Sequence, residues 1–192
     1  MKRVVAHLIV IAACVLTAQS ALAQSDLGFK RVGAQLGLVD PENASSTLGL
    51  GVFVDHGTLA PRIKLASHLD YWGKSEDVPF GGTARVRDIA LSCRARYMFP
   101  VSSPRVQPYA GGGLGLHFLN GKIEIPDQVI MGTLVPGSTS SSSDTKLGLD
   151  IGGGIEAPIN PKTNFLAELW FGIVSDVNTV SLKVGLAHVL GH

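Results

Sequence analysis

Charged side chains recur at every second position in several segments, a spacing that suits charge pairing better than catalysis. Asp150 and Glu156 share one face of such a segment. Six strand residues separate them by about 20 Å, too far for joint acid–base chemistry. Opposite charges on neighbouring segments would instead neutralise one another. The predicted network comprises Arg62, Lys64, Asp70, Asp88, Arg94, Arg96, Lys146, Asp150, Glu156, Glu168 and Lys183.

The remaining reactive residue types do not assemble a site. His68 and His117 fall on polar faces and can join the charge network, but no spacing supplies a set of metal ligands. The glycine run at 111–115 lacks the Lys-Ser/Thr ending of a phosphate loop. Cys93 falls on an apolar face, where a thiol is usually inert. We therefore expect no catalytic residue, no metal and no cofactor.

Composition sets the class of protein. The chain has 192 residues and a formal net charge of +1, with 45% apolar and 16% charged residues. Length favours a single domain, and near-neutrality argues against nucleic-acid binding, which needs a clustered basic excess. The chain is too apolar for a disordered tail. Its 23 glycines follow no G-X-Y period, which excludes collagen.

The first residues have the pattern of an export signal. Lys2 and Arg3 precede an apolar run from Val4 to Leu16, and Ala21-Leu22-Ala23 forms a small-x-small cleavage site. This predicts a signal peptide over residues 1–23, Sec export and a mature domain over 24–192. Two alternatives remain: a retained membrane helix, for which the run is short, and lipidation of Cys14 after a lipobox-like sequence.

Eight segments of the mature chain read as strands. Apolar and polar residues alternate with period two, while glycines and β-branched residues weaken any helical reading. The expected strands lie at about 29–39, 47–56, 62–72, 84–99, 106–119, 146–157, 165–174 and 180–190.

Glycine placement decides which face meets water. The faces opposite the apolar residues combine charges with many glycines, such as Gly49, Gly51 and Gly152. A solvated strand surface does not need glycine, whereas the crowded interior of a narrow barrel does. We expect an all-β fold, an eight-stranded antiparallel up-and-down transmembrane β-barrel with its apolar face toward lipid. The alternative is a soluble periplasmic β-barrel that carries an apolar ligand.

Connection lengths support the membrane barrel. With the N-terminus periplasmic, the outward connections lie at about 40–46, 73–83, 120–145 and 175–178, and include both long loops. The periplasmic connections, at about 57–61, 100–105 and 158–163, are all short. Outer-membrane barrels show this asymmetry.

Two motifs resemble a known family. Val106 to Leu116 contains Pro108-Tyr109-Ala110-Gly111 and further glycines, and is similar to the "PY-x-G-x-G-x-G" strand of small outer-membrane β-barrel (OmpA/OmpX-like, porin-family) proteins. Leu149 to Glu156, followed by a Pro/Asn turn, resembles their sixth strand. The resemblance covers essentially the whole mature chain. It implies location in the outer membrane of a Gram-negative bacterium and contact with outer-membrane lipid and the barrel-assembly machinery.

Two features qualify this resemblance. Many such proteins end in an aromatic residue, whereas this chain ends Val189-Leu190-Gly191-His192, which weakens the expectation of efficient insertion by the assembly machinery. Lipid A deacylases are similar small barrels that use a His-x-Ser pair. The nearest match here is His56-Gly57-Thr58, in a predicted periplasmic turn, so a lipid A-modifying enzyme is the less favoured alternative.

The expected function is therefore non-catalytic. An eight-stranded interior is filled by side chains, so a wide diffusion pore is not expected. We expect a monomeric barrel that displays the loops 73–83 and 120–145. The second loop is apolar enough to bind an extracellular ligand or to fold over the barrel mouth. Deleting residues 121–143 should leave the barrel folded and remove any surface binding.

Overall fold

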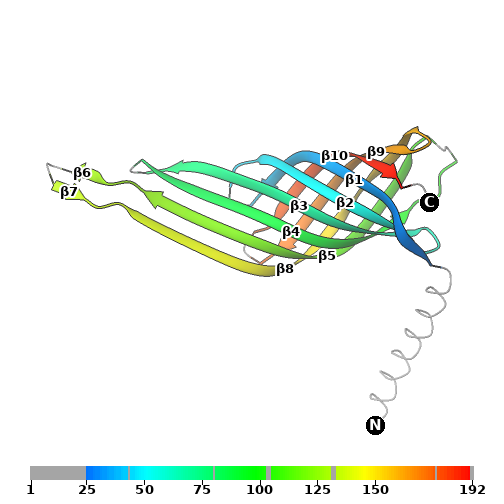
Figure 1. Ribbon diagram of the computed structural model, residues 1–192, viewed down its shortest axis with the longest axis horizontal. Helices are drawn as coiled ribbons and strands as arrows, with labels where there is room; N and C mark the ends of the chain where they lie inside the picture. The colour runs from blue at the N-terminus through cyan, green and yellow to red at the C-terminus, as the bar shows by residue number, and fades with distance from the viewer. Residues whose placement is uncertain are drawn as a thin grey trace, which may run out of the picture.

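Eight strands close into one antiparallel barrel (Figure 1). The computed structural model describes residues 25–42, 44–79, 81–102, 105–130, 133–175 and 177–190. Each barrel strand pairs with the barrel strands before and after it in the chain. The barrel strands are β1 (Asp26–Pro41), β2 (Thr47–Ala60), β3 (Ile63–Val78), β4 (Gly82–Met98), β5 (Gln107–Ile125), β8 (Ser138–Asn160), β9 (Thr163–Val174) and β10 (Thr179–Val189). The predicted eight-stranded up-and-down topology is confirmed.

The first and last strands close the barrel. β1 pairs with β10 without a register shift, from Arg31 opposite Val189 to Pro41 opposite Thr179. The predicted signal peptide over residues 1–23 and the alternative lipidation site at Cys14 lie outside the described residues. In the described part of the chain, no helix has the length and apolarity needed to cross a membrane.

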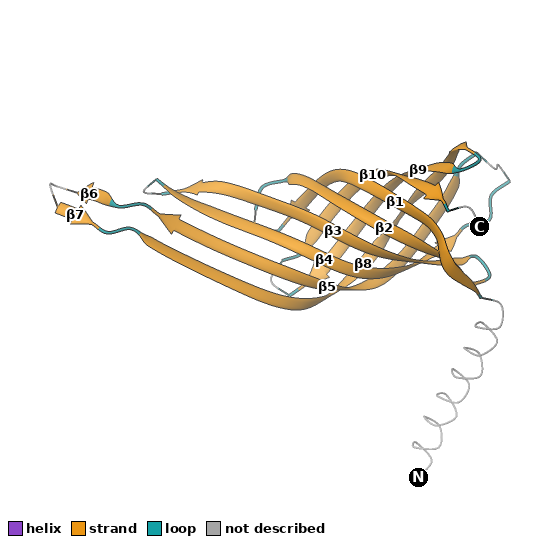
Figure 2. Ribbon diagram, in the orientation of Figure 1, coloured by secondary structure: helices purple, strands orange, loops and turns teal. Residues whose placement is uncertain are grey.

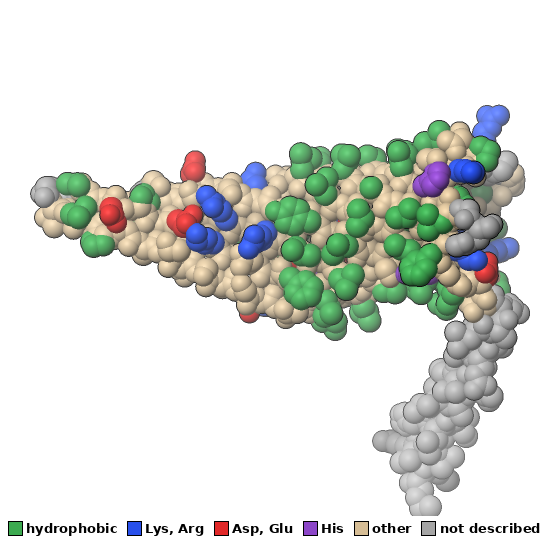
Figure 3. All heavy atoms as spheres, in the orientation of Figure 1, with side chains coloured by type: hydrophobic (Ala, Val, Ile, Leu, Met, Phe, Trp, Pro, Cys, Tyr) green, Lys and Arg blue, Asp and Glu red, His purple; other side chains and the backbone are tan. Residues whose placement is uncertain are grey.

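The outer face of the barrel is apolar. Leu48, Leu50 and Leu147 each expose at least 60% of their surface. Figure 3 shows hydrophobic side chains spread over the barrel body, next to an end of mixed polar character. Charged and aromatic residues instead fill the interior, among them Arg96, Trp170 and Glu168. A contiguous apolar surface of this kind is unsuited to water.

β3, β4, β5 and β8 continue well beyond the other barrel strands, on the side opposite the start of β1 and the end of β10 (Figure 2). We call this extension, residues 73–79, 81–87, 120–130 and 133–143, the protrusion. β6 (Gln128–Ile130) and β7 (Thr133–Val135) pair with each other at its end. The predicted loops 73–83 and 120–145 are therefore wrong as loops, because most of their residues are paired strand. Both faces of the protrusion meet water, so the apolar–polar contrast that marks a strand is weak there.

The connections at the other end are shorter than expected at two places. Pro61-Arg62 joins β2 to β3, and Pro161-Lys162 joins β8 to β9. Arg62 adopts φ +66° in its turn and its carbonyl accepts a hydrogen bond from Met98 N at 2.8 Å. The placement of Arg62 in the interior network is therefore wrong, because Pro61 starts a two-residue turn and leaves Arg62 exposed.

Candidate functional site

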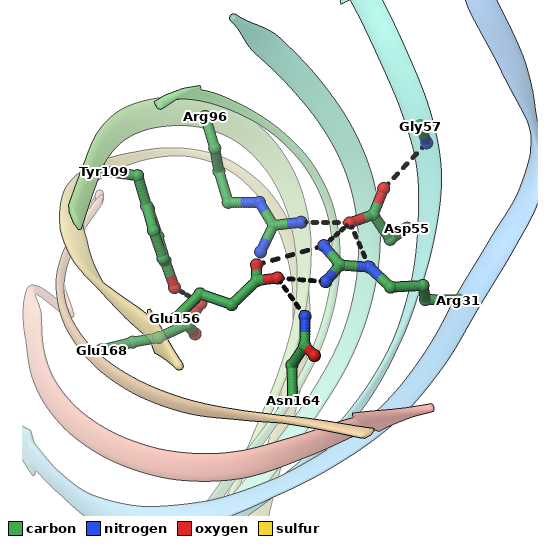
Figure 4. Close-up of polar contacts among 8 residues, drawn as sticks. All are labelled: Arg31, Asp55, Gly57, Arg96, Tyr109, Glu156, Asn164 and Glu168. Atoms are coloured by element: carbon green, nitrogen blue, oxygen red, sulfur yellow. Dashed lines mark hydrogen bonds and ion pairs between the residues drawn. The ribbon is translucent and has the colours of Figure 1, made fainter. Parts of the chain in front are cut away.

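The barrel interior holds a charge cluster centred on Asp55, on the side away from the protrusion (Figure 4). We call it the lower cluster. Arg31 of β1 donates from Nε to Asp55 Oδ2 of β2 at 3.1 Å and from Nη2 to Glu156 Oε2 of β8 at 3.1 Å. Arg96 of β4 donates from Nη2 to the same Asp55 oxygen at 2.8 Å. One carboxylate thus serves two guanidinium groups, and the cluster links four strands across the lumen.

A β-bulge directly after Asp55 helps to hold its carboxylate in this cluster. The β2–β3 register shifts between Asp55 and Gly57, where Gly57 has φ +90° and donates its N–H to Asp55 Oδ1 at 2.8 Å. A glycine at positive φ is the usual device for such a bulge. Sequence reasoning missed both Arg31 and Asp55. The available signal was their position in the period-two pattern. Arg31 shares a strand face with Gly33 and Gln35, and Asp55 shares a strand face with Gly51 and Phe53.

Further side chains complete the lower cluster. Tyr109 donates its hydroxyl to Glu168, and Asn164 donates to Glu156. The guanidinium carbon of Arg96 lies 5.3 Å from the Tyr109 ring centroid, within cation–π range. Lys64 is half-buried and points inward beside these groups. Cations and carboxylates are equal in number, as a buried cluster requires: Arg31, Lys64 and Arg96 against Asp55, Glu156 and Glu168.

A second cluster lies on the protrusion side of the first. Arg94 donates from Nε to Asp150 Oδ2 at 2.8 Å and from Nη2 to Asp70 Oδ2 at 3.0 Å. Lys183 donates to Asp70 Oδ1 at 2.6 Å. Arg94 also stacks over Trp170, with 4.8 Å from guanidinium carbon to ring centroid. Two cations and two carboxylates again balance.

A histidine–carboxylate pair lies near the protrusion. His117 Nδ1 is 2.7 Å from Asp88 Oδ2, and both side chains are buried. Half-buried Lys146 of β8 is the register partner of His117. A cavity of about 30 Å3, lined in part by Asp88, His117 and Arg94, separates this pair from the second cluster. It has room for about one water molecule and no larger solute.

The predicted network residues therefore separate into three groups. Arg62 is exposed in its turn, and Lys64 and Lys146 are half-buried. The other eight are buried in the lumen: Asp70, Asp88, Arg94, Arg96, Asp150, Glu156, Glu168 and Lys183. They divide between the two clusters and the His117 pair rather than forming one continuous chain.

The described residues contain little that resembles an active site. No group of three or more His, Cys, Asp or Glu side chains in the described ranges is placed to hold a metal ion. His56 Nε2 lies 2.9 Å from Ser67 Oγ, but its predicted place in a turn is wrong, because β2 continues to Ala60. Among the described residues, no carboxylate hydrogen-bonds to His56 to orient it as a base. Cys93 is exposed on the outer face.

The protrusion has an inner and an outer face of different character. Inward-pointing positions on β3, β4 and β5 include Val78, Ala84, Val86 and Ile123. A groove of about 260 Å3 is lined by three of them, Ala84, Val86 and Ile123. It is bordered by Lys74, Glu76, Ser140, Ser142 and, from the first outward connection, Ala44. Ser45 of that connection donates its backbone N–H to Glu76 Oε1 at 2.8 Å. The hydroxyl and N–H of Ser45 lower the pKa of Glu76 below its ordinary value of 4.5.

The Ser45–Glu76 contact should open in acid. A carboxyl whose pKa is lowered by folding holds its contact above the unfolded pKa and loses it as pH falls through the folded pKa. The Ser45 amide chemical shift should therefore titrate with a midpoint below 4.5, and Glu76→Gln should abolish that titration at all pH values. A midpoint at or above 4.5 would contradict this account.

Comparisons with known proteins give consistent matches. A family model described as an outer membrane protein β-barrel domain matches residues 8–188. Neisserial surface protein A has a TM-score of 0.62 and 17% identity, with 86% of this chain and 100% of that chain covered. A major outer membrane protein of Thermus thermophilus has a TM-score of 0.59 and 14% identity, with 83% and 99% covered.

A third solved structure extends this set. Ail, the attachment invasion locus protein of Yersinia pestis, in complex with the heparin analogue sucrose octasulfate, has a TM-score of 0.53 and 13% identity, with 83% of this chain and 95% of that chain covered. At these identities the likeness concerns the fold. No significant match was found among curated proteins.

Proposed function

The chain belongs to the outer membrane protein β-barrel domain family, and on that premise we propose that it is a non-catalytic outer-membrane anchor whose protrusion binds an extracellular partner. The observation that carries the proposal is the protrusion, which raises an apolar inner groove beyond the lipid-facing surface. The outer-membrane family and apolar outer face argue against a soluble periplasmic carrier.

The filled lumen supports an anchor rather than a wide pore. Two charge clusters cross the described interior at different heights, and the cavity between the second cluster and the Asp88–His117 pair is about 30 Å3. Ordinary solutes are far larger than one water molecule. A lipid A-modifying enzyme is less favoured, because the His56–Ser67 pair has no orienting carboxylate among the described residues. We expect Sec export, insertion by the barrel-assembly machinery and a monomeric product.

The edge of the protrusion offers a second element of recognition. Residues 138–147 of β8 pair with β5, whereas β9 ends at Val174, opposite Gly148. Within the described ranges, no strand pairs with the other edge of residues 138–145, so this edge is free, and residues 138–143 carry no charge. Free edges pair with extended segments of other proteins, and main-chain hydrogen bonds then add to contacts in the groove. The partner that fits is an extended protein segment with apolar side chains.

Shortening the protrusion should abolish partner binding and spare the barrel. Gly121 and Ser142 are directly opposed, so Asn-Gly in place of residues 122–141 closes a two-residue hairpin. We expect cells that display this variant to bind immobilised extended peptides with apolar side chains at least about tenfold less than cells with the full chain. Heat-dependent gel mobility should show that the barrel still folds.

Point variants test whether binding depends on the inner face of the protrusion or is weakened by any substitution in the protrusion. Val86→Ser with Ile123→Ser alters the groove, whereas Ser141→Ala with Ser143→Ala alters outward-facing positions as the matched control. Only the first pair should weaken binding. Equal binding by the full chain and the shortened variant would refute the proposal.

A further inference from the structure

The outer face of the protrusion changes character in successive rows above the apolar barrel surface. The strand register aligns these rows across β3, β4 and β5. Moving outward, they are Tyr71–Ile89–Phe118, Gly73–Arg87–Asn120, Ser75–Arg85–Lys122 and Asp77–Thr83–Glu124. The face thus passes from apolar to basic to acidic within four rows. Figure 3 shows the basic side chains gathered next to the hydrophobic part of the surface.

Strand geometry places the basic rows at the depth of lipid headgroups. Residues on one face of a strand recur about every 6.8 Å along the strand. With a tilt of about 40°, each row rises about 5 Å along the membrane normal. Arg87 therefore lies about 5 Å, and Arg85 and Lys122 about 10 Å, above the last apolar row. The headgroup layer of one leaflet occupies about the same interval.

The charges of these rows are not balanced within the chain. Arg85 lies 3.6 Å from Glu124, and Lys122 bonds the same carboxylate. Within the described residues, Arg87 has no ion-pair partner. Three cations therefore share one carboxylate, in contrast to the two balanced clusters inside the barrel. The cationic excess is available to an external anion.

A groove between the basic side chains gives that anion a place. It measures about 370 Å3, and its lining includes Arg85, Arg87, Lys122, Asn120 and Tyr71. On the β3 side the groove is lined by Gly73 and Ser75, whose small or absent side chains leave space for a ligand. Asn120 lies at the same level as Arg87 and borders the groove, and its Nδ2 donates to Ser143 Oγ of β8 at 2.6 Å. Tyr71 stands where apolar and polar rows meet, a usual position for an interfacial aromatic residue.

We propose that Arg85, Arg87 and Lys122 bind the phosphate groups of an outer-leaflet lipid whose acyl chains lie on the Tyr71–Ile89–Phe118 row. The geometry favours a lipid over a soluble polyanion. A lipid places its apolar chains and its anion on one face in this order and at this spacing. A bound lipid phosphate would also neutralise the excess charge at the base of the protrusion.

The test is lipid binding by the full chain purified from membranes into non-ionic detergent. Native mass spectrometry measures binding of bis-phosphorylated lipid A and of dephosphorylated lipid A. The test variant is Arg85→Gln/Arg87→Gln/Lys122→Gln. The matched control, Lys30→Gln/Arg105→Gln/Lys162→Gln, removes the same charge near the opposite end of the barrel. Heat-dependent gel mobility checks that both variants fold.

The expected effect follows from the net charge of the site. A basic side chain near a lipid surface contributes about a fivefold gain in affinity, and the test variant removes three of them while Glu124 remains in both proteins. The test variant should therefore lose about 125-fold in affinity for bis-phosphorylated lipid A, and the control less than about twofold. The chain with all its basic residues should prefer the phosphorylated lipid. Equal losses in both variants, or no preference for the phosphorylated lipid, would overturn the proposal.

A second variant should raise the affinity for the lipid instead of lowering it, and its result can be interpreted even if the triple variant does not fold. Glu124→Gln removes the competing carboxylate, so affinity for bis-phosphorylated lipid A should rise about fivefold. Unchanged or weaker binding would count against the site. A soluble polyanion is tested with heparin: if heparin binds more tightly than the lipid and displaces it at equal phosphate and sulfate concentration, the lipid assignment is wrong.

Discussion

Replacing Asp55 with alanine should destabilise the barrel by about 3–5 kcal/mol, the usual cost of leaving a buried charge without its partner. Asp55 is 1% exposed and accepts hydrogen bonds from both Arg31 and Arg96. Its loss leaves Arg96, which is fully buried, without its carboxylate. Urea unfolding of the protein in lipid vesicles, followed by tryptophan fluorescence, measures the change in free energy of unfolding.

A double-mutant cycle distinguishes charge imbalance from simple loss of packing. Arg96→Met alone should cost less than Asp55→Ala, because Asp55 keeps Arg31. With both substitutions, Arg31 still holds Glu156 and the cluster is neutral again. The double variant should therefore be more stable than Asp55→Ala alone. Its loss should fall short of the sum of the two single losses by a coupling energy of about 1–3 kcal/mol. Additive losses would show that the cluster acts only by filling space.

Replacing Gly152 with alanine should destabilise the barrel by about 3 kcal/mol through overpacking. A Cβ at this position would lie 2.3 Å from the carbonyl oxygen of Leu169 and 2.8 Å from Cδ2 of Trp170. Neither group is a flexible side-chain end, since one is backbone and the other belongs to a ring that is 1% exposed. The strands β8 and β9 would have to separate, and Trp170 would lose its position under Arg94.

The matched control is Gly121→Ala in the protrusion. Its Cβ would meet only Ser142 Oγ, at 3.3 Å, which can rotate away. We expect a change of less than about 0.5 kcal/mol for this variant. The two alanine variants are compared by urea unfolding, and a red shift of tryptophan emission should accompany Gly152→Ala alone. Similar stability of the two variants would mean that the barrel adjusts its spacing more easily than its backbone contacts suggest.

Where one strand face meets lipid and the other meets the lumen, the sequence predicted the structure well. Segments such as 84–99 alternate strongly because Ile89 and Leu91 point outward while Ser92 and Arg94 point inward. The protrusion lacks that contrast, so the sequence pattern alone predicts loops where the structure has paired strands. In the protrusion, the strands continue because each pairs with a neighbouring strand. Alternation within one segment does not reveal this pairing.

The interior network was predicted only in part, for reasons of local geometry. Asp55 was missed although it has the same period-two phase as Gly51 and Phe53, because its partners Arg31 and Arg96 belong to other strands and are remote in sequence. Arg31 was missed because its segment alternates weakly, and its partners Asp55 and Glu156 are remote in sequence. Arg62 was misplaced because the turn at Pro61 ends the strand earlier than the polar alternation suggested. The sequence shows the sign of each charged residue. How deeply each side chain is buried, and which residue it pairs with, depend on how the closed barrel brings distant strands together.

The pairing of β1 with β10 has a kinetic consequence. Arg31 and Val189 are opposed although more than 150 positions separate them. Loop-closure entropy and high contact order make such a pairing slow, and it cannot begin before residues 179–189 have been exported. Until then β1 and the growing end of the sheet are open edges that other chains can join. The period of greatest aggregation risk for this protein is therefore its transit to the membrane, before the ring of strands is complete.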